Sequence, residues 1–164
     1  MSSAAPHPDP WNHARIVGAQ LGAWSALSVV VGAAGLAANA AGAWPPAWAP
    51  VVVGFSIQCL LWGAIDGGIA WFGARDRRRR LAAAGPSADR AGAAFGARLL
   101  RLLRLNAGLD VLYVAAGIAV LALWRTPEGL GHGLGVIVQG GFLLVFDAWH
   151  GWAWVPRRVR AASS

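Results

Sequence analysis

Four long apolar stretches constrain this chain more than any other feature. They run from about residue 16 to 38, 51 to 73, 102 to 124 and 134 to 155. Each is close to the roughly 20 apolar residues that a helix needs to cross the hydrocarbon core of a bilayer. The 164-residue chain is 57% hydrophobic and only 13% charged, which excludes an ordinary soluble domain. Since backbone polar groups in lipid must be satisfied internally, the sequence predicts an all-α, integral membrane four-helix bundle.

The segments between and around these stretches define the domain organisation. We expect a disordered N-terminal tail over 1–14, a first transmembrane hairpin over 15–73, a cytoplasmic Arg-rich loop over 74–97, a second transmembrane hairpin over 98–156 and a basic C-terminal tail over 157–164. Residues 1–14 are rich in Pro, Ser and Ala, a composition typical of untethered chain ends. Within the first hairpin, the Pro- and Trp-containing segment 44–50 marks a turn.

The arginines predict how the chain is oriented. Arg15, the central loop with its lead-in, and the C-terminal tail hold all of them except Arg125. By the positive-inside rule, both termini and the central loop are expected in the cytoplasm, with the protein crossing the inner (plasma) membrane several times. Eight arginines beside the spans are expected to contact anionic lipid headgroups: Arg75, Arg77, Arg78, Arg79, Arg80, Arg98, Arg101 and Arg104. We therefore expect the lipid bilayer, and no nucleic acid, as a partner.

The second and fourth stretches share a spacing pattern. Gly54, Gln58, Asp66 and Trp71 in one are separated by the same intervals as Gly135, Gln139, Asp147 and Trp152 in the other. This match predicts two tandem helical hairpins related by a pseudo-two-fold axis along the membrane normal. Coincidence among Gly- and Ala-rich helices is the alternative interpretation. A homodimer is also compatible with so thin a bundle.

Three carboxylates inside the apolar stretches are the candidate functional groups. Asp66, Asp110 and Asp147 each fall near the centre of a span, where an ionised aspartate costs roughly 2.5–3.5 kcal/mol. Counting residues along the helices puts all three at one depth, just on the cytoplasmic side of the midplane. The complete predicted polar cluster is Asp66, Asp110, Asp147, Asn106, Gln20, Tyr113, Gln58 and Gln139. Without a cation at their depth, the acids must share protons or hold a cation.

Several functions remain open for such a cluster. Proton- or cation-coupled transport or conduction is one, and a scaffold or subunit in which polar side chains bind helices together is the other main hypothesis. Asp147 and His150 lie one helical turn apart, so a divalent cation is a weaker hypothesis. We expect His150 to be wet at a helix end and His132 to be solvated in an outer loop. No cofactor is predicted, and no catalytic motif indicates an enzyme.

Three segments carry a resemblance to a known family. They are Trp62-Gly63-Ala64-Ile65-Asp66, the stretch from Leu105-Asn106 through Asp110 to Tyr113, and Gln139-Gly140-Gly141-Phe142 through Asp147. Together they resemble small bacterial four-span membrane proteins grouped as a domain of unknown function. The resemblance implies a fold and a membrane location, and it implies no activity.

Overall fold

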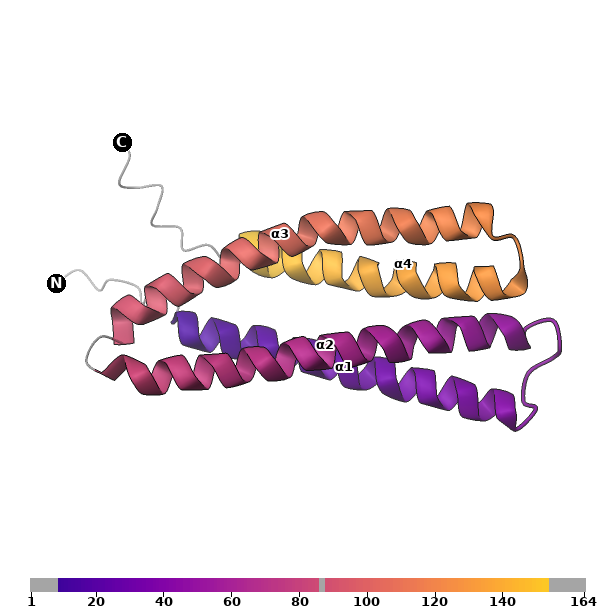
Figure 1. The fold of residues 1–164 in the computed structure, drawn as a ribbon, viewed down its shortest axis with the longest axis horizontal. Coiled ribbons are helices and arrows are strands. Elements are labelled where there is room, and N and C mark those ends of the chain that lie inside the picture. The colour runs from indigo at the N-terminus through magenta and orange to yellow at the C-terminus, as the bar shows by residue number, and fades with distance from the viewer. Residues whose placement is uncertain (1–8, 86–87, 154–164) are drawn as a thin grey trace.

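Four long helices make up the computed structural model, which describes residues 9–85 and 88–153 (Figure 1). They are α1 (Pro10–Ala40), α2 (Ala49–Ala84), α3 (Ala88–Leu123) and α4 (Pro127–Ala148), and a π-helical turn, η2 (Trp149–Ala153), follows α4. All four are long and apolar enough to cross a membrane. The predicted all-α four-helix bundle is therefore confirmed.

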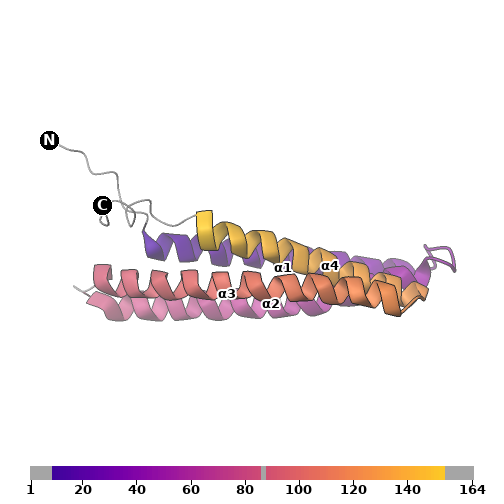
Figure 2. The same cartoon turned by 90° about the horizontal axis from the view of Figure 1, so that it is seen from above.

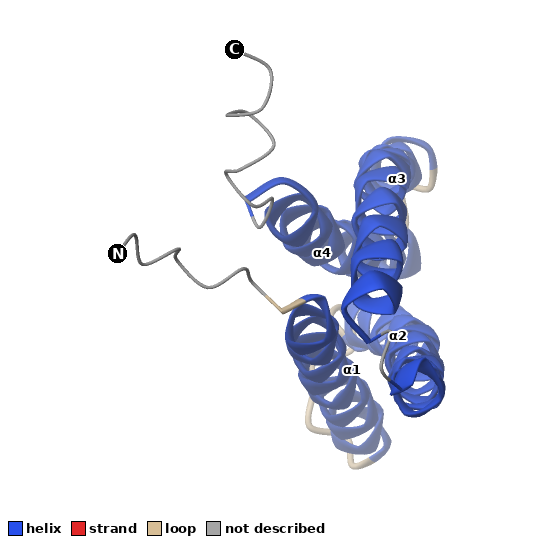
Figure 3. Ribbon diagram, turned by 90° about the vertical axis from the view of Figure 1, so that its left-hand side faces the viewer, coloured by secondary structure: helices blue, strands red, loops and turns tan. Residues whose placement is uncertain are grey.

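The helices form two antiparallel hairpins that lie side by side. One pairs α1 with α2 and the other pairs α3 with α4, as the views along and down the bundle show (Figures 1 and 3). The end of α2 and the start of α3 lie toward the same end of the bundle as the start of α1 and the end of α4 (Figure 2). We call this the Arg-rich end, because it carries Arg75–Arg80. The opposite end, with the connections 41–48 and 124–126, is the short-loop end.

Local sequence fixes where two of the helices begin. The Asp9 carboxylate accepts a hydrogen bond of 2.9 Å from the Trp11 amide, and Pro10 follows it at the first helical position. At the start of α4, the Thr126 hydroxyl accepts one of 3.2 Å from the Gly129 amide, with a proline again next in sequence. These side chains satisfy amides that a helix start leaves without partners, and proline has no amide to satisfy there.

The predicted boundary between the N-terminal tail and the first helix, at residue 14, was wrong. Helix α1 begins at Pro10, so residues 10–14 are helical rather than part of a tail. Trp11 is buried and stacks on Phe95 of α3, with 4.9 Å between ring centroids. Gly92 makes room for this indole, since a Cβ there would lie 2.7 Å from the Trp11 ring nitrogen. Burial of this large aromatic side chain against α3, together with the Asp9 cap, stabilises residues 10–14 as helix.

The predicted loop over 74–97 was wrong as well. Helix α2 continues to Ala84 and α3 begins at Ala88, so helix covers most of that segment. Alanine and arginine are strong helix formers. Asp76 also forms a 2.7 Å ion pair with Arg80, one turn later on the same helix. With 36 residues, α2 is about 54 Å long, well beyond the ~30 Å hydrocarbon core. The arginines therefore sit on a helical extension.

Toward the short-loop end, glycines let the two hairpins come together. A Cβ on Gly54 of α2 would lie 2.8 Å from the Glu128 carbonyl oxygen of α4. A Cβ on Gly131 of α4 would press on the Val51 carbonyl of α2, and one on Gly135 would lie 2.5 Å from the Gln58 Cβ. Small residues allow this close backbone approach in membrane bundles. The close contact between α2 and α4 thus depends on glycine, which has no side chain, at these positions.

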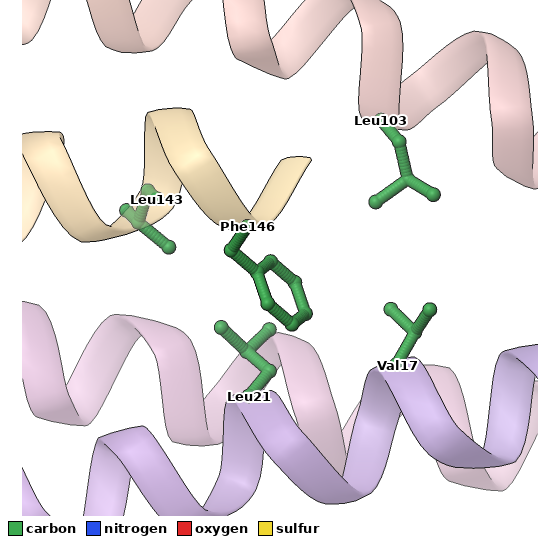
Figure 4. Close-up of a cluster of buried hydrophobic side chains, with 5 residues drawn as sticks. All are labelled: Val17, Leu21, Leu103, Leu143 and Phe146. Atoms are coloured by element: carbon green, nitrogen blue, oxygen red, sulfur yellow. The ribbon is translucent and has the colours of Figure 1, made fainter. Parts of the chain in front are cut away.

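Toward the Arg-rich end, large side chains fill the space between the hairpins. Val17 and Leu21 of α1, Leu103 of α3, and Leu143 and Phe146 of α4 form a buried hydrophobic cluster (Figure 4). By contrast, α2 and α3 touch each other over only a short stretch. The hairpins are therefore held together here by side chains rather than by backbone contact, which leaves room for a cavity.

Candidate functional site: an acidic cavity between helices

A cavity of about 350 Å³ lies between α2 and α3. Its α2 wall runs from Trp62 to Asp76 and its α3 wall from Phe95 to Tyr113. Side chains of α1 and α4, including those of the hydrophobic cluster, close it from behind. Because all four helices contribute, the cavity belongs to the bundle as a whole.

Three aspartates from three different helices line this cavity. Asp66 of α2, Asp110 of α3 and Asp147 of α4 are 1%, 3% and 5% exposed. The Asp147 carboxyl is close enough to Asp110, Asn106 and Asp66 to interact with them electrostatically. Asp66 interacts electrostatically with Asp110 in turn. The structure therefore brings together the three acids that the sequence singled out.

The three carboxyls have unused hydrogen-bonding capacity. Asp66 Oδ2 and Asp110 Oδ2 are buried without a hydrogen-bond partner, and within residues 9–85 and 88–153 none of the three acids forms an ion pair. Buried carboxylates that repel one another can lower their energy by sharing protons or by accepting a cation. The arrangement can therefore take up a proton or a positively charged group.

Two other predicted residues also reach this cavity. Asn106 and Tyr113 both line it, one turn before and one turn after Asp110 on α3. The Tyr113 ring packs edge-on against Trp62, with 5.0 Å between centroids. An amide and two aromatic rings thus stand beside the carboxyls.

Gln139 does not join the acids; it forms a second polar site, which we call the glutamine site. Its side chain is 1% exposed, and its oxygen accepts a 2.9 Å hydrogen bond from the Trp24 indole of α1. Its nitrogen donates to the Ser28 hydroxyl at 3.1 Å and lies 3.7 Å from the Cys59 sulfur. A buried amide with all of these partners joins α4 to α1 and α2.

Gln58 lies apart from both sites. Its side-chain nitrogen is 3.0 Å from Nδ1 of His132, and that imidazole stacks on Trp124 with 5.4 Å between centroids. The prediction of a solvated His132 in an outer loop was wrong, because α4 begins at Pro127 and includes it. Gln58 and Gln139, predicted as members of one polar cluster, therefore make two separate contacts.

Gln20 is likewise directed elsewhere, toward His150. The imidazole Nε2 lies 2.8 Å from the Gln20 Oε1, and His150 is 4% exposed, so the expectation of a wet histidine at a helix end was wrong. The His13 ring lies edge-on to it, 5.3 Å between centroids, because α1 starts early enough to place His13 in the bundle. The π-helical turn at 149–153 widens the helix at this point.

The described residues contain no group of three or more His, Cys, Asp or Glu side chains placed to hold a metal ion. His150 uses its Nε2 on Gln20 rather than turning it to Asp147. We therefore build no metal centre on the Asp147/His150 pair.

The comparison with known families adds one finding to this geometry. The family described as a family of unknown function (DUF6992) matches residues 20–148, a range that holds all three cavity acids. The chain belongs to the DUF6992 family. The predicted resemblance is thereby confirmed at the level of an uncharacterised family. No curated protein matches the chain, and no solved structure does.

Arg104 and Arg98, two of the arginines predicted to contact lipid headgroups, are also placed within the fold of this DUF6992 protein. Arg104 donates a 2.8 Å hydrogen bond to the Gly151 carbonyl, and its guanidinium lies 5.9 Å from the Trp152 ring centre. It therefore caps the end of the last helix, as a cation there is expected to do. Arg98 lines the Arg-rich end of the cavity together with Asp76. A headgroup role for the arginine set stays a prediction.

Sequence reasoning missed the residues that complete the glutamine site of the DUF6992 protein. Ser25, Ser28, Gly32 and Gly35 follow one another at helical spacing on α1 and face α2 and α4. Ser25 donates a 2.7 Å hydrogen bond to the Gly63 carbonyl, and Ser28 bonds Gln139. This stripe of small residues was the available signal. Trp24, in contrast, carries no such signal in the sequence.

Proposed function

We propose that this DUF6992 protein is an inner-membrane protein whose acidic cavity binds and releases protons or a cation as part of coupled transport or conduction. The observation that carries the proposal is the set of three aspartates that line one cavity, with two of their oxygens unpartnered. Buried polar groups without partners are destabilising, so these oxygens favour a bound proton or cation.

The helices that carry the acids also give the site a way to act. Asp66, Asp110 and Asp147 stand on α2, α3 and α4, and α2 and α3 share few contacts. Adding or removing one proton changes the repulsion among the three carboxyls. Since little direct packing holds α2 to α3, a change in this repulsion is able to alter the distance between the two helices. A carrier needs such a proton-dependent conformational change.

The arginine distribution supports an orientation for this proposal. Thirteen of the 14 arginines lie near the start of α1, on the second half of α2, on the first half of α3, or after α4 in the sequence, and Arg125 is the exception. The positive-inside rule then assigns both termini and the α2–α3 turn to the cytoplasm. A reporter fused to the C-terminus and found active only outside the cytoplasm would overturn this orientation.

A scaffold or subunit role is the second candidate, and the glutamine site favours it. Gln139 joins three helices by bonds to Trp24, Ser28 and Cys59, which is what interhelical glue does. The repeat-equivalent glycines, Gly54 and Gly135, each sit against the opposite hairpin, which supports an origin by duplication. Neither observation explains the three acids in the cavity, so we place the scaffold role second.

Infrared spectroscopy of the purified protein in lipid tests the proposal. Near neutral pH, where exposed carboxylates are fully ionised, the spectrum should show a protonated carboxyl band that changes with pH, because the three acids share protons. Asp66→Asn and Asp147→Asn should each reduce or shift that band while the protein remains folded. Asp89→Asn, on the exposed first turn of α3, is the matched control and should leave it unchanged. A spectrum without such a band, or one identical in all variants, would contradict the proposal.

A further inference from the structure

The shape and walls of the acidic cavity indicate what kind of ligand it takes. Along α2 the cavity extends from Trp62 to Asp76, which is about 21 Å of helix. A volume of about 350 Å³ spread over that length describes a narrow channel. It lies at the lower limit of the ~300–1,000 Å³ of small-molecule sites. It has room for one slender, elongated molecule.

Most of the cavity wall is hydrocarbon or aromatic. The side chains between its two ends include Ile69 on α2 with Leu99 and Leu102 on α3, and Phe146 closes it from α4. Ile69 and Leu102 are also exposed on the outer surface of the bundle, the surface that faces lipid in a membrane. An apolar molecule dissolved in the bilayer is therefore able to enter between α2 and α3.

Among the described residues, the buried acids without an ion-pair partner lie toward one end of this channel. Asp66 and Asp110 lie near the Trp62–Tyr113 end, and Asp147 joins them from α4. At the other end, the cavity lining includes Arg98 and Asp76, and Asp76 is already paired with Arg80. The unpartnered oxygens of Asp66 and Asp110 thus favour a positive group beside the two aromatic rings.

From this combination we infer that the cavity binds a single-chain amphipathic organic cation, such as a long-chain alkylammonium, with its cationic head at Asp66 and Asp110. The alkyl chain lies along the apolar channel toward the Arg-rich end. An inorganic cation fits less well, because hard cations require several oxygen ligands and most of this wall is apolar. The inference rests on the proposed function and names its substrate class. Binding of the cation displaces a proton that the three acids had shared.

Calorimetric titration of the full chain in lipid nanodiscs tests the inference. The probe is decyltrimethylammonium, which keeps its charge at every pH, and decanol is the uncharged comparison. Empty nanodiscs supply the baseline for partition into lipid. We expect saturable binding of the cation alone. Repeating the titration in two buffers of different ionisation enthalpy should reveal proton release.

Variants locate the binding. Asp66→Asn and Asp110→Asn should each weaken binding of decyltrimethylammonium at least tenfold, and Asp89→Asn should leave it unchanged. The two cavity variants guard against misfolding of either one, which thermal unfolding checks. Equal binding of decanol, or no saturable binding by the wild type, would overturn the inference. If the pH-dependent carboxyl band persists in that event, the proton site stands and only the ligand class is wrong. Loss of both would remove the proposed function as well.

Discussion

Two buried polar sites lie on α4 only eight residues apart, and they differ in how completely they are bonded. At the glutamine site, Gln139 bonds Trp24 and Ser28 and contacts Cys59. About 12 Å further along the helix, the carboxyl of Asp147 meets two other acids, and two oxygens of that trio have no partner. A fully bonded group fixes a structure, whereas an incompletely bonded acid keeps capacity for a ligand.

Helix packing also differs between the two sites: it is tight near the fully bonded glutamine site and looser near the acids. Near the short-loop end, Gly54, Gly131 and Gly135 bring the backbones of α2 and α4 together. On the Arg-rich side of the glutamine site, α2 and α3 share few contacts and the cavity lies between them. Closely packed backbones resist a change in helix separation, whereas helices with a cavity between them tolerate such a change. The chain thus combines a rigid half with a half that is able to respond.

The largest effect is expected from filling the contact between α2 and α4. Gly131→Ala places a methyl group against the Val51 carbonyl, where backbone cannot move aside cheaply. Overpacking of this kind should lower the free energy of unfolding by about 2–3 kcal/mol. Gly108→Ala is the matched control, because no atom lies near its Cβ position. It should be neutral or slightly stabilising in reversible unfolding from mixed micelles, and equal losses in the two variants would contradict the rigid-half interpretation.

A smaller loss is expected at the glutamine site. Gln139→Leu keeps the side chain's bulk but leaves the Trp24 indole and the Ser28 hydroxyl without their partner. Leaving such buried groups unsatisfied should cost about 1–2 kcal/mol of unfolding free energy. Gln58→Leu, at a half-buried contact with His132, should cost less in the same assay. An unchanged stability of Gln139→Leu would show that its bonds do not hold the bundle.

The sequence predicted the spans and the acids well, for a physical reason. Apolar length determines what crosses a bilayer, and a carboxylate in such a stretch has to face the bundle interior. Asp66, Asp110 and Asp147 therefore could be placed together from spacing alone. Their partners among the amides could not, because rotation of α1 and α4 decides whether Gln20 meets an acid or His150. Spacing along a helix does not determine that rotation.

The ends of the helices were the least predictable part. The Pro, Ser and Ala content of residues 1–14 predicts a tail, and the arginines of residues 74–97 predict a polar loop. The helical state of residues 10–14 and of most of 74–97 depends on tertiary contacts such as Trp11 on Phe95. It also depends on the helix-forming tendency of alanine and arginine, which is independent of the bilayer. Composition alone does not distinguish such an extension from a polar loop.

The most direct test of the account is the unfolding free energy of Asp66→Asn, measured beside Gln139→Leu in the same lipid–detergent mixture. Removing one carboxylate relieves repulsion from Asp110 and Asp147 and keeps an amide that can hydrogen bond. We expect a stability within about 0.5 kcal/mol of the wild type, or slightly above it. A loss as large as that of Gln139→Leu would contradict it, because the acids would then be holding the bundle together.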